Sequence, residues 1–172
     1  IVETVPTFRS LMVHLDPLTT SPNDVQARIN GLLGDLNEAA EPGPIWQVPV
    51  CYEDALAPDL AEVAGATGLT PQQVVELHSG ALFQIYMLGF LPGFPERGGL
   101  PDPLYLPRRT NPRTRVPAGS VAIAQSLSAI YPVVSPGGWH LIGNTPIRLF
   151  DPTRAMPALF ASGDRIRFVP VG

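Results

Sequence analysis

The sequence predicts an α+β fold that is mainly β, with a closed β-barrel preceded by a partial α/β layer. From residue 81 onward, short apolar or alternating runs are separated by turn residues, which is typical of barrel strands. The 16 Gly and 21 Pro of the 172 residues lie between these runs, where they favour sharp turns. Residues 2–50 have the order strand, strand, helix, strand, like the back half of a split βαβ unit. We therefore expect a partial N-terminal subdomain over residues 1–50 and a barrel domain over residues 51–172.

The N-terminal subdomain is predicted from one alternating pattern and one capped helix. Leu11, Val13 and Leu15 alternate with more polar residues in the period of a half-buried strand. Ser21 can cap a helix that has Pro22 at its first position. The apolar face of this helix comprises Val25, Ile29, Leu32, Leu33 and Leu36. Residues 41–44 are expected to end it, before a strand over residues 46–52. Because the chain opens on Ile1 within a strand pattern, we expect that it has lost its natural N-terminus.

The barrel domain begins with two predicted short helices. An apolar stripe from Leu60 to Thr67 is closed by Gly68, and Thr70 and Gln73 have the spacing of a capping box. Helix, glycine turn and helix is also the outline of a DNA-reading motif. The second helix contains no Arg, however, and DNA binding requires charges that neutralise phosphates. We therefore expect no nucleic-acid partner.

The remaining strands are predicted at residues 81–91, 120–124, 129–134, 139–143, 146–150 and 164–171. In the last of them, Arg165 and Arg167 alternate with Ile166 and Phe168, which places the two charges on one face of the strand. The regular spacing of these runs favours closure into a barrel.

The composition excludes several chemistries. All 11 basic residues counted as Lys and Arg are Arg, in a chain of net charge −4. A lysine Schiff base and a phosphate-loop lysine are therefore excluded, and ATP, if used, must be held by Arg or by another chain. The single cysteine, Cys51, permits no intrachain disulfide, is interpreted as buried filler, and fits the cytoplasm. No apolar run reaches the length of a membrane span, and no signal peptide is visible.

Three runs combine turn residues with aromatic residues or Arg: residues 86–94, 108–120 and 135–139. The second run carries Arg108, Arg109, Arg113 and Arg115 within eight positions. A basic loop on an acidic protein is typical of a site that faces an anion or an acidic partner. The alternative is a set of barrel turns whose aromatic residues close the core.

The histidines and serines provide further candidates. His78 ends a predicted helix, where the helix dipole would raise its pKa and favour an imidazolium that donates to an anion; the alternative is a His that only caps the helix. Ser120 and Ser135 stand outside any G-x-S-x-G elbow. We interpret both as hydroxyl donors beside the backbone at Gly119 and Gly137–Gly138. The scattered histidines do not have the spacing of a metal site.

Five motifs resemble a known family: LHS at 77–79, YMLGFLPGFP at 86–95, PRRTNPRTRVPAGSVAIA at 107–124, YPVVSPGGWHLIG at 131–143 and TPIRLFDP at 145–152. With them the sequence resembles the allophanate hydrolase subunit 1 family, from about residue 5 to the C-terminus. That family is also described as the B subunit of 5-oxoprolinase, as the sporulation kinase inhibitor family and as carboxyltransferase subdomain C/D of urea carboxylase. Residues 124–130 and 51–59 depart from its usual glycine-containing pattern.

The resemblance implies a cyclophilin-like β-barrel after a ferredoxin-like layer. It also implies a hetero-oligomeric hydrolase that opens 5-oxoproline to glutamate with ATP, or acts on allophanate, beside a homologous subunit 2 (the C subunit) and a third, lactam-handling subunit. ATP would be held mainly by the partners, and the isolated chain would be inactive. The residues expected to be catalytic are His78, Arg113, Arg115 and Ser120. Those expected to bind substrate or partner are Tyr86, Gly89, Phe90, Pro92, Gly93, Phe94, Gly119, Ser135, Pro136, Gly137, Gly138 and Trp139.

One functional alternative stays open beside the enzyme subunit. The aromatic residues of the three runs can line a groove for a proline-containing segment of a sensor histidine kinase, which would make the chain a non-catalytic inhibitor. Prolyl isomerase activity rests on fold analogy alone.

Overall fold

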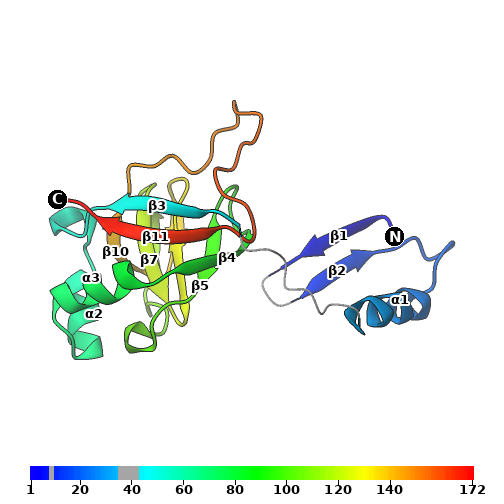
Figure 1. The fold of residues 1–172 in the computed structure, drawn as a ribbon, viewed down its shortest axis with the longest axis horizontal. Coiled ribbons are helices and arrows are strands. Elements are labelled where there is room, and N and C mark those ends of the chain that lie inside the picture. Colours follow the sequence, from blue (N-terminus) through cyan, green and yellow to red (C-terminus); the bar gives the residue numbers. More distant parts are fainter. Residues whose placement is uncertain (8–9, 35–42) are drawn as a thin grey trace. The chain divides into compact units, whose positions relative to one another are not determined.

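The computed structural model describes residues 1–7, 10–34 and 43–172. The chain separates into two compact units, Ile1–Pro42 and Gly43–Gly172, and each is described by itself (Figure 1). No helix among the described residues is long and apolar enough to cross a membrane.

The first unit contains a two-stranded antiparallel sheet and one helix. Strands β1 (Glu3–Pro6) and β2 (Leu11–His14) pair as the alternating pattern predicts. Helix α1 (Pro22–Gly34) begins where expected, because the Ser21 hydroxyl accepts from the Asp24 backbone N–H at 3.2 Å. Only Val25 of this helix is buried, and Leu32 and Leu33 of the predicted apolar face are exposed. Leu36 and the expected helix end lie partly or wholly outside the described residues.

The second unit is built on a seven-stranded sheet in the order β10-β7-β8-β5-β4-β11-β3. Its strands are β3 (Ile45–Val50), β4 (Phe83–Leu88), β5 (Pro95–Gly98), β7 (Ser120–Ala124), β8 (Leu127–Ile130), β10 (His140–Asn144) and β11 (Arg165–Pro170). The two edges, β3 and β10, are joined because Cys51 and Asn144 exchange backbone hydrogen bonds of 2.9 Å in both directions. The sheet thus curls into a nearly closed barrel, which confirms the mainly β, α+β fold.

The strand expected over residues 46–52 does not belong to the N-terminal layer. It is β3, and it runs parallel to β11 over its whole length, from Ile45 beside Arg165 to Val50 beside Pro170. The division between the two compact units accordingly falls between Pro42 and Gly43, whereas the sequence predicts it at residue 50. Pairing with a strand 120 residues away leaves no local signal in the sequence.

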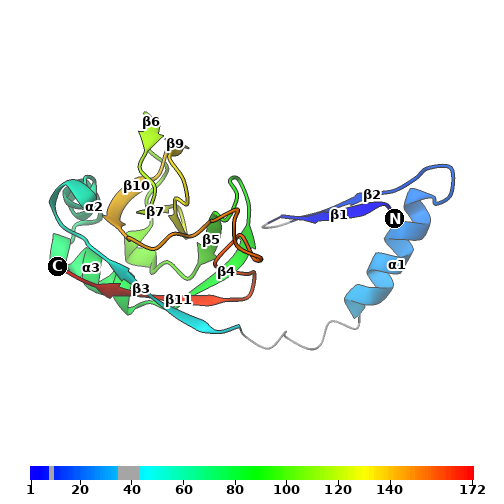
Figure 2. The ribbon, with the colours of Figure 1, turned by 90° about the horizontal axis from the view of Figure 1, so that it is seen from above.

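Three other expected strands differ in the structure. Residues 146–150 form no strand and contribute only an isolated bridge between Phe150 and Ala158. The strand expected at 129–134 lies at 127–130, and the one expected to reach residue 91 ends at Leu88. Two short strands that were not predicted, β6 (Arg113–Val116) and β9 (Ser135–Gly137), pair as a separate antiparallel ribbon. Figure 2 shows this ribbon at the top of the barrel unit, away from β3 and β11.

The two predicted helices are confirmed. Helix α2 (Leu60–Thr67) ends at Gly68, whose φ of 72° lies in the left-handed region that glycine adopts readily. Helix α3 (Pro71–Gly80) begins at Thr70 with both hydrogen bonds of the capping box. Both helices pack on the larger of two apolar clusters, together with β3, β4 and β11. The smaller cluster contains Phe94, Tyr131 and Trp139 and lies under the predicted site runs.

Candidate functional site

A small pocket of about 90 Å³ collects parts of all three predicted runs. The pocket, which we call the aromatic pocket, is lined by Phe90, Phe94, Glu96, Arg108, Tyr131, Gly137, Gly138 and Trp139. Residues 90 and 94 come from the turn after β4, residue 108 from the arginine-rich loop, and residues 137–139 from the end of β9 and the turn that follows it. The fold therefore brings together segments that are separated by up to 49 positions in the sequence.

The turn after β4 projects one aromatic side chain away from the core. The Gly89 N–H donates to the Phe94 carbonyl at 3.1 Å and closes the turn. Gly93 has a φ of 71°, and Phe90 has a φ of 67°, which non-glycine residues seldom adopt. Phe90 is 71 % exposed and its ring meets the edge of Phe94 at 5.6 Å. A strained backbone that holds an aromatic ring in solvent is typical of a binding loop.

Three polar side chains of the aromatic pocket have no hydrogen-bond or ion-pair partner in the part of the chain that the structure describes. The Arg108 guanidinium lies 5.8 Å from the Trp139 ring centroid and forms no ion pair. The Glu96 carboxylate and the Tyr131 hydroxyl make no hydrogen bond to any residue within 1–7, 10–34 and 43–172, although Tyr131 is only 1 % exposed. Buried polar groups are normally satisfied by a partner. These three groups are therefore available to a ligand.

The electrostatic environment keeps the Tyr131 hydroxyl protonated. Burial raises the pKa of Tyr131 above its ordinary value of 10.0, although the positive charges of Arg108 and Arg113 act in the opposite direction. At neutral pH this phenol can donate a hydrogen bond to an oxyanion in the pocket. Gly137 permits the arrangement, because a Cβ at that position would overlap the Tyr131 hydroxyl.

One acidic residue, Asp59, binds two of the four arginines in the arginine-rich loop, and no sequence pattern pointed to it. Asp59, only 2 % exposed, accepts from Arg113 Nη1 at 2.8 Å and Nη2 at 2.6 Å, and from Arg109 Nη1 at 3.1 Å. It also accepts from the Leu141 backbone N–H at 2.7 Å. Glu62 binds Arg109 from its other side at 2.8 Å. The charges of Arg109 and Arg113 are thus balanced inside the protein.

Arg108 and Arg115 keep the uncompensated positive charge. They lie on opposite sides of the Asp59-bound arginines in the sequence, and neither forms an ion pair with a residue in the described ranges. Arg115 lines a second hollow of about 150 Å³ together with Arg113 and Ser120. We call this hollow the ribbon pocket, because β6 carries both arginines.

The structure corrects the expectation for His78. The side chain is fully buried, and burial, followed by the charge of Arg97, lowers its pKa well below 6.5. Its ring stacks on Phe168 with centroids 4.5 Å apart. The expected imidazolium was wrong, because removal from water disfavours the charged ring by more than the end of a helix favours it.

His78 belongs to a buried polar chain that the sequence did not predict. Its Nδ1 lies 2.9 Å from the Tyr52 hydroxyl and its Nε2 lies 3.1 Å from Ser128 Oγ. Arg97 donates to the same Ser128 Oγ at 3.2 Å, and its guanidinium lies 4.7 Å from the Phe168 ring centroid. Burial lowers the pKa of Arg97 to about 9. Arg97 Nη1 is buried without a hydrogen-bond partner among the described residues.

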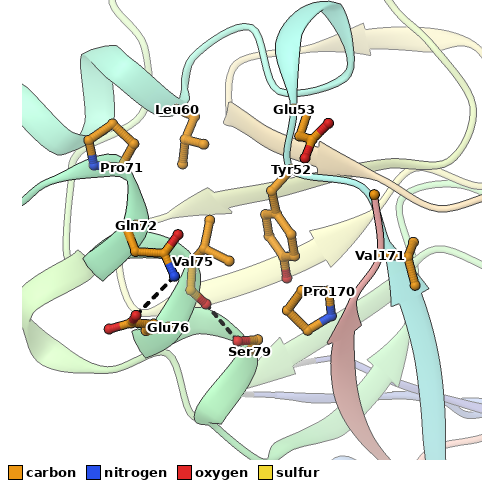
Figure 3. Close-up of a pocket in the computed structure, with 11 residues that line it drawn as sticks. Tyr52, Glu53, Leu60, Pro71, Gln72, Val75, Glu76, Ser79, Pro170 and Val171 are labelled. Carbon is orange, nitrogen blue, oxygen red and sulfur yellow. Dashed lines mark hydrogen bonds between the residues drawn. The ribbon is translucent and has the colours of Figure 1, made fainter.

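A larger hollow of about 380 Å³ lies beside this chain, and Tyr52 is one of its lining residues (Figure 3). Glu53, Glu76 and Gln72 stand on its walls, and Gln72 donates to Glu76 at 2.9 Å. None of the predicted site residues lines this hollow.

The remaining predicted residues serve mainly to shape the backbone. Gly119 has a φ of 79° and lies against the Thr145 carbonyl, while Ser135 Oγ donates to the Pro136 carbonyl at 3.3 Å. Tyr86 packs its ring over Gly98. Gly89 and Pro92 belong to the turn after β4, and Pro136 is exposed on β9. His140 Nε2 lies 2.9 Å from the Pro107 carbonyl.

No group of three or more His, Cys, Asp or Glu within the described residues could hold a metal ion.

Comparison with protein families gives one match that spans most of the chain. The model for the carboxyltransferase domain, subdomain C and D, matches residues 1–160. The B subunit of 5-oxoprolinase from Escherichia coli O157:H7 is 44 % identical over 171 residues, which are 99 % of this chain and 78 % of that protein.

Solved structures show the same fold. The crystal structure of TTHA0988 is 37 % identical with a TM-score of 0.81 over 99 % of this chain, which spans 32 % of that longer protein. The urea carboxylase of Kluyveromyces lactis has a TM-score of 0.78 at 21 % identity, over 99 % of this chain and 18 % of the enzyme. That second likeness shows the fold alone.

Proposed function

Because this chain belongs to the family of the carboxyltransferase domain, subdomain C and D, we propose that it is the B subunit of a 5-oxoprolinase. The complex would open the lactam ring of 5-oxo-L-proline to L-glutamate while hydrolysing ATP to ADP and phosphate. The 44 % identity to the B subunit of another 5-oxoprolinase supports the assignment to this type of complex. The aromatic pocket carries the assignment of the substrate site.

The chemistry of the aromatic pocket matches a small cyclic amide that bears a carboxylate. Arg108 can bind the carboxylate of 5-oxoproline with paired N–H donors. Glu96 can accept the lactam N–H, and the buried Tyr131 hydroxyl can donate to the lactam carbonyl, whose oxygen gains negative charge when the ring is attacked. Trp139 and Phe94 offer apolar walls to the ring methylenes. Each free polar group of the pocket thereby acquires a partner.

The composition supports a composite enzyme. Since the chain contains no lysine, we propose that partner subunits hold most of the ATP, and that a homologous subunit 2 covers the exposed Phe90. A third subunit would present the lactam. The complex is proposed to act in the cytoplasm.

The four residues expected to be catalytic divide into two groups. We assign Arg113 a positioning role, because its guanidinium is bound to Asp59 and fixes the ribbon next to the substrate pocket. His78 is likewise proposed as a positioning residue, since it is neutral and buried. Arg115 and Ser120 line a separate pocket and remain available to bind a ligand.

Substitution of Arg108 tests this assignment in the complex co-expressed with subunit 2 and with the third, lactam-handling subunit. Arg108→Gln is expected to raise the KM for 5-oxoproline about 10- to 100-fold, because one charge-assisted bidentate contact contributes about 1.5–3 kcal/mol. The matched control is Arg28→Gln, an exposed arginine in the other compact unit. ADP release dependent on 5-oxoproline is the measurement.

Normal kinetics in Arg108→Gln would remove the aromatic pocket as the substrate site. If the wild-type complex also failed to turn over 5-oxoproline, inhibition of a sensor histidine kinase would become the better interpretation. Phe90 favours that second function, since an exposed aromatic ring beside a pocket can dock a proline-containing segment.

A further inference from the structure

The ribbon pocket, on β6 and β7, has the features of a second anion site that does not depend on the aromatic pocket. It lies between the loop at residues 55–58, strand β6 and the start of β7. Its lining includes Arg113, Arg115, Ser120 and Asn144. All four of these side chains carry N–H or O–H donors. Asn144 Nδ2 already donates to the Ala118 carbonyl at 3.2 Å and Arg113 is bound to Asp59, so Arg115 and Ser120 are the residues whose donors are left for a ligand.

Ser120 supplies the most informative observation. The residue is only 4 % exposed, yet its hydroxyl makes no hydrogen bond with any residue that the structure describes. Ser120 is one of the residues that line the ribbon pocket, so its hydroxyl is accessible from the hollow. A buried serine normally satisfies its hydroxyl within the protein. This hydroxyl belongs to a buried residue and is left for whatever occupies the hollow.

Arg115 supplies the charge. It is exposed on β6, and no acidic side chain of the described residues pairs with it. Arg113 lies in the same pocket with two of its five N–H groups bound to Asp59. The Asp59 and Glu62 carboxylates together compensate Arg113 and Arg109, and Arg115 has no counter-ion among the described residues.

We propose that the ribbon pocket binds a phosphate-type oxyanion, held by the Arg115 guanidinium and the Ser120 hydroxyl. A guanidinium fork and a hydroxyl that approach from different strands suit a tetrahedral anion with several acceptor oxygens. The volume of about 150 Å³ leaves room for a group attached to the phosphate. Two anion sites then flank the β6–β9 ribbon, with Arg108 in one and Arg115 in the other.

The test is titration of the full 172-residue chain with inorganic phosphate. Calorimetry measures the affinity, and NMR chemical shifts of the backbone amides locate the binding site. Wild type is expected to bind phosphate with a Kd of about 1 mM. Arg115→Gln is expected to weaken binding about tenfold or more, and Ser120→Ala about threefold, because the first loses a charged donor and the second a neutral one. Arg28→Gln is the control for removal of an exposed arginine, and the amide spectrum shows that each variant is folded.

The site of binding separates this proposal from the proposed function. If adding phosphate changes the backbone amide chemical shifts of residues 113–120, and the changes persist in Arg108→Gln, the result supports the ribbon pocket even if 5-oxoproline is not a substrate. Absence of phosphate binding by wild type overturns the proposal. Unchanged affinity in both Arg115→Gln and Ser120→Ala overturns it as well. A second titration uses acetate in place of phosphate. Equally tight acetate binding would overturn the assignment to a tetrahedral anion.

Discussion

Asp59 decides the charge of the whole arginine-rich loop although it lies about 50 residues upstream. It binds Arg109 and Arg113 at the same time and accepts the Leu141 N–H. A buried carboxylate with these donors is satisfied, so the two guanidinium groups act as supports for the loop. The adjacent Arg108 and Arg115 keep their charge for ligands. One residue thus separates structural from functional arginines.

Asp59→Asn tests this role. The amide is expected to lower the free energy of unfolding by about 2 kcal/mol, because it leaves Arg113 without its bidentate anion while both arginines remain partly exposed. Chemical denaturation measures the change. Glu62→Gln is the matched control at the exposed end of the same cluster, with an expected loss below about 1 kcal/mol. Equal losses in both variants would contradict the central role of Asp59.

At the scale of the elements, the β6–β9 ribbon places the two pockets. Arg113 faces Gly137 and Val116 faces Ser135 across the ribbon. One strand carries Arg115 to the ribbon pocket, and the other carries Gly137 to the aromatic pocket. The geometry of both pockets therefore depends on one short two-stranded element, which is held in place by Asp59 and by Tyr131 beneath Gly137.

The two glycines after Pro136 offer a matched test of this element. Gly137→Ala is expected to cost about 1–3 kcal/mol, because the new methyl group overlaps the Tyr131 hydroxyl and forces the ring or the ribbon to shift. Gly138→Ala meets only Pro112 at 3.6 Å, an ordinary contact, and should cost less than about 0.5 kcal/mol. Thermal unfolding separates the two variants. Similar transitions for both would show that Tyr131 does not restrict position 137.

At the scale of the whole molecule, the buried chain of Tyr52, His78, Ser128 and Arg97 connects helix α3 to strands β5 and β8. His78 is neutral when the protein is folded because its pKa is lowered by burial and by Arg97. The unfolded chain binds a proton at this histidine below about pH 6.5. Folding therefore excludes a proton that the unfolded chain accepts, and stability depends on pH.

The expected pH dependence has a definite sign. The contribution of His78 is fully present above about pH 6.5 and is lost as the pH falls toward the lower folded-state pKa. Between pH 7 and 5.5 the free energy of unfolding should fall by about 1 kcal/mol from this group. His78→Gln should flatten the curve in this window. Tyr52→Phe, which removes the hydrogen bond but keeps the ring, should retain it because burial is the larger cause. A wild-type stability that does not change over this window would contradict a buried neutral His78.

Features that depend on neighbouring residues could be predicted from the sequence. The caps at Ser21 and Thr70, the end of α2 at Gly68 and the strand at 120–124 all match the structure. Helix caps and strand alternation involve residues within about four positions of each other, so a short stretch of sequence is enough to predict them. The motifs at residues 86–95 and 131–143 also indicated the family.

The tertiary structure decided which of these residues carry free charge. The sequence grouped Arg108, Arg109, Arg113 and Arg115, but only the packing of Asp59 against Leu141 and the loop showed that the two inner arginines are neutralised. It likewise placed His78 against Phe168, 90 residues away, and so reversed the expected direction of its pKa shift. Protonation and pairing depend on burial and on partners distant in sequence. Composition determined that a basic site exists on this acidic chain, and long-range contacts determined which groups in it remain available to a ligand.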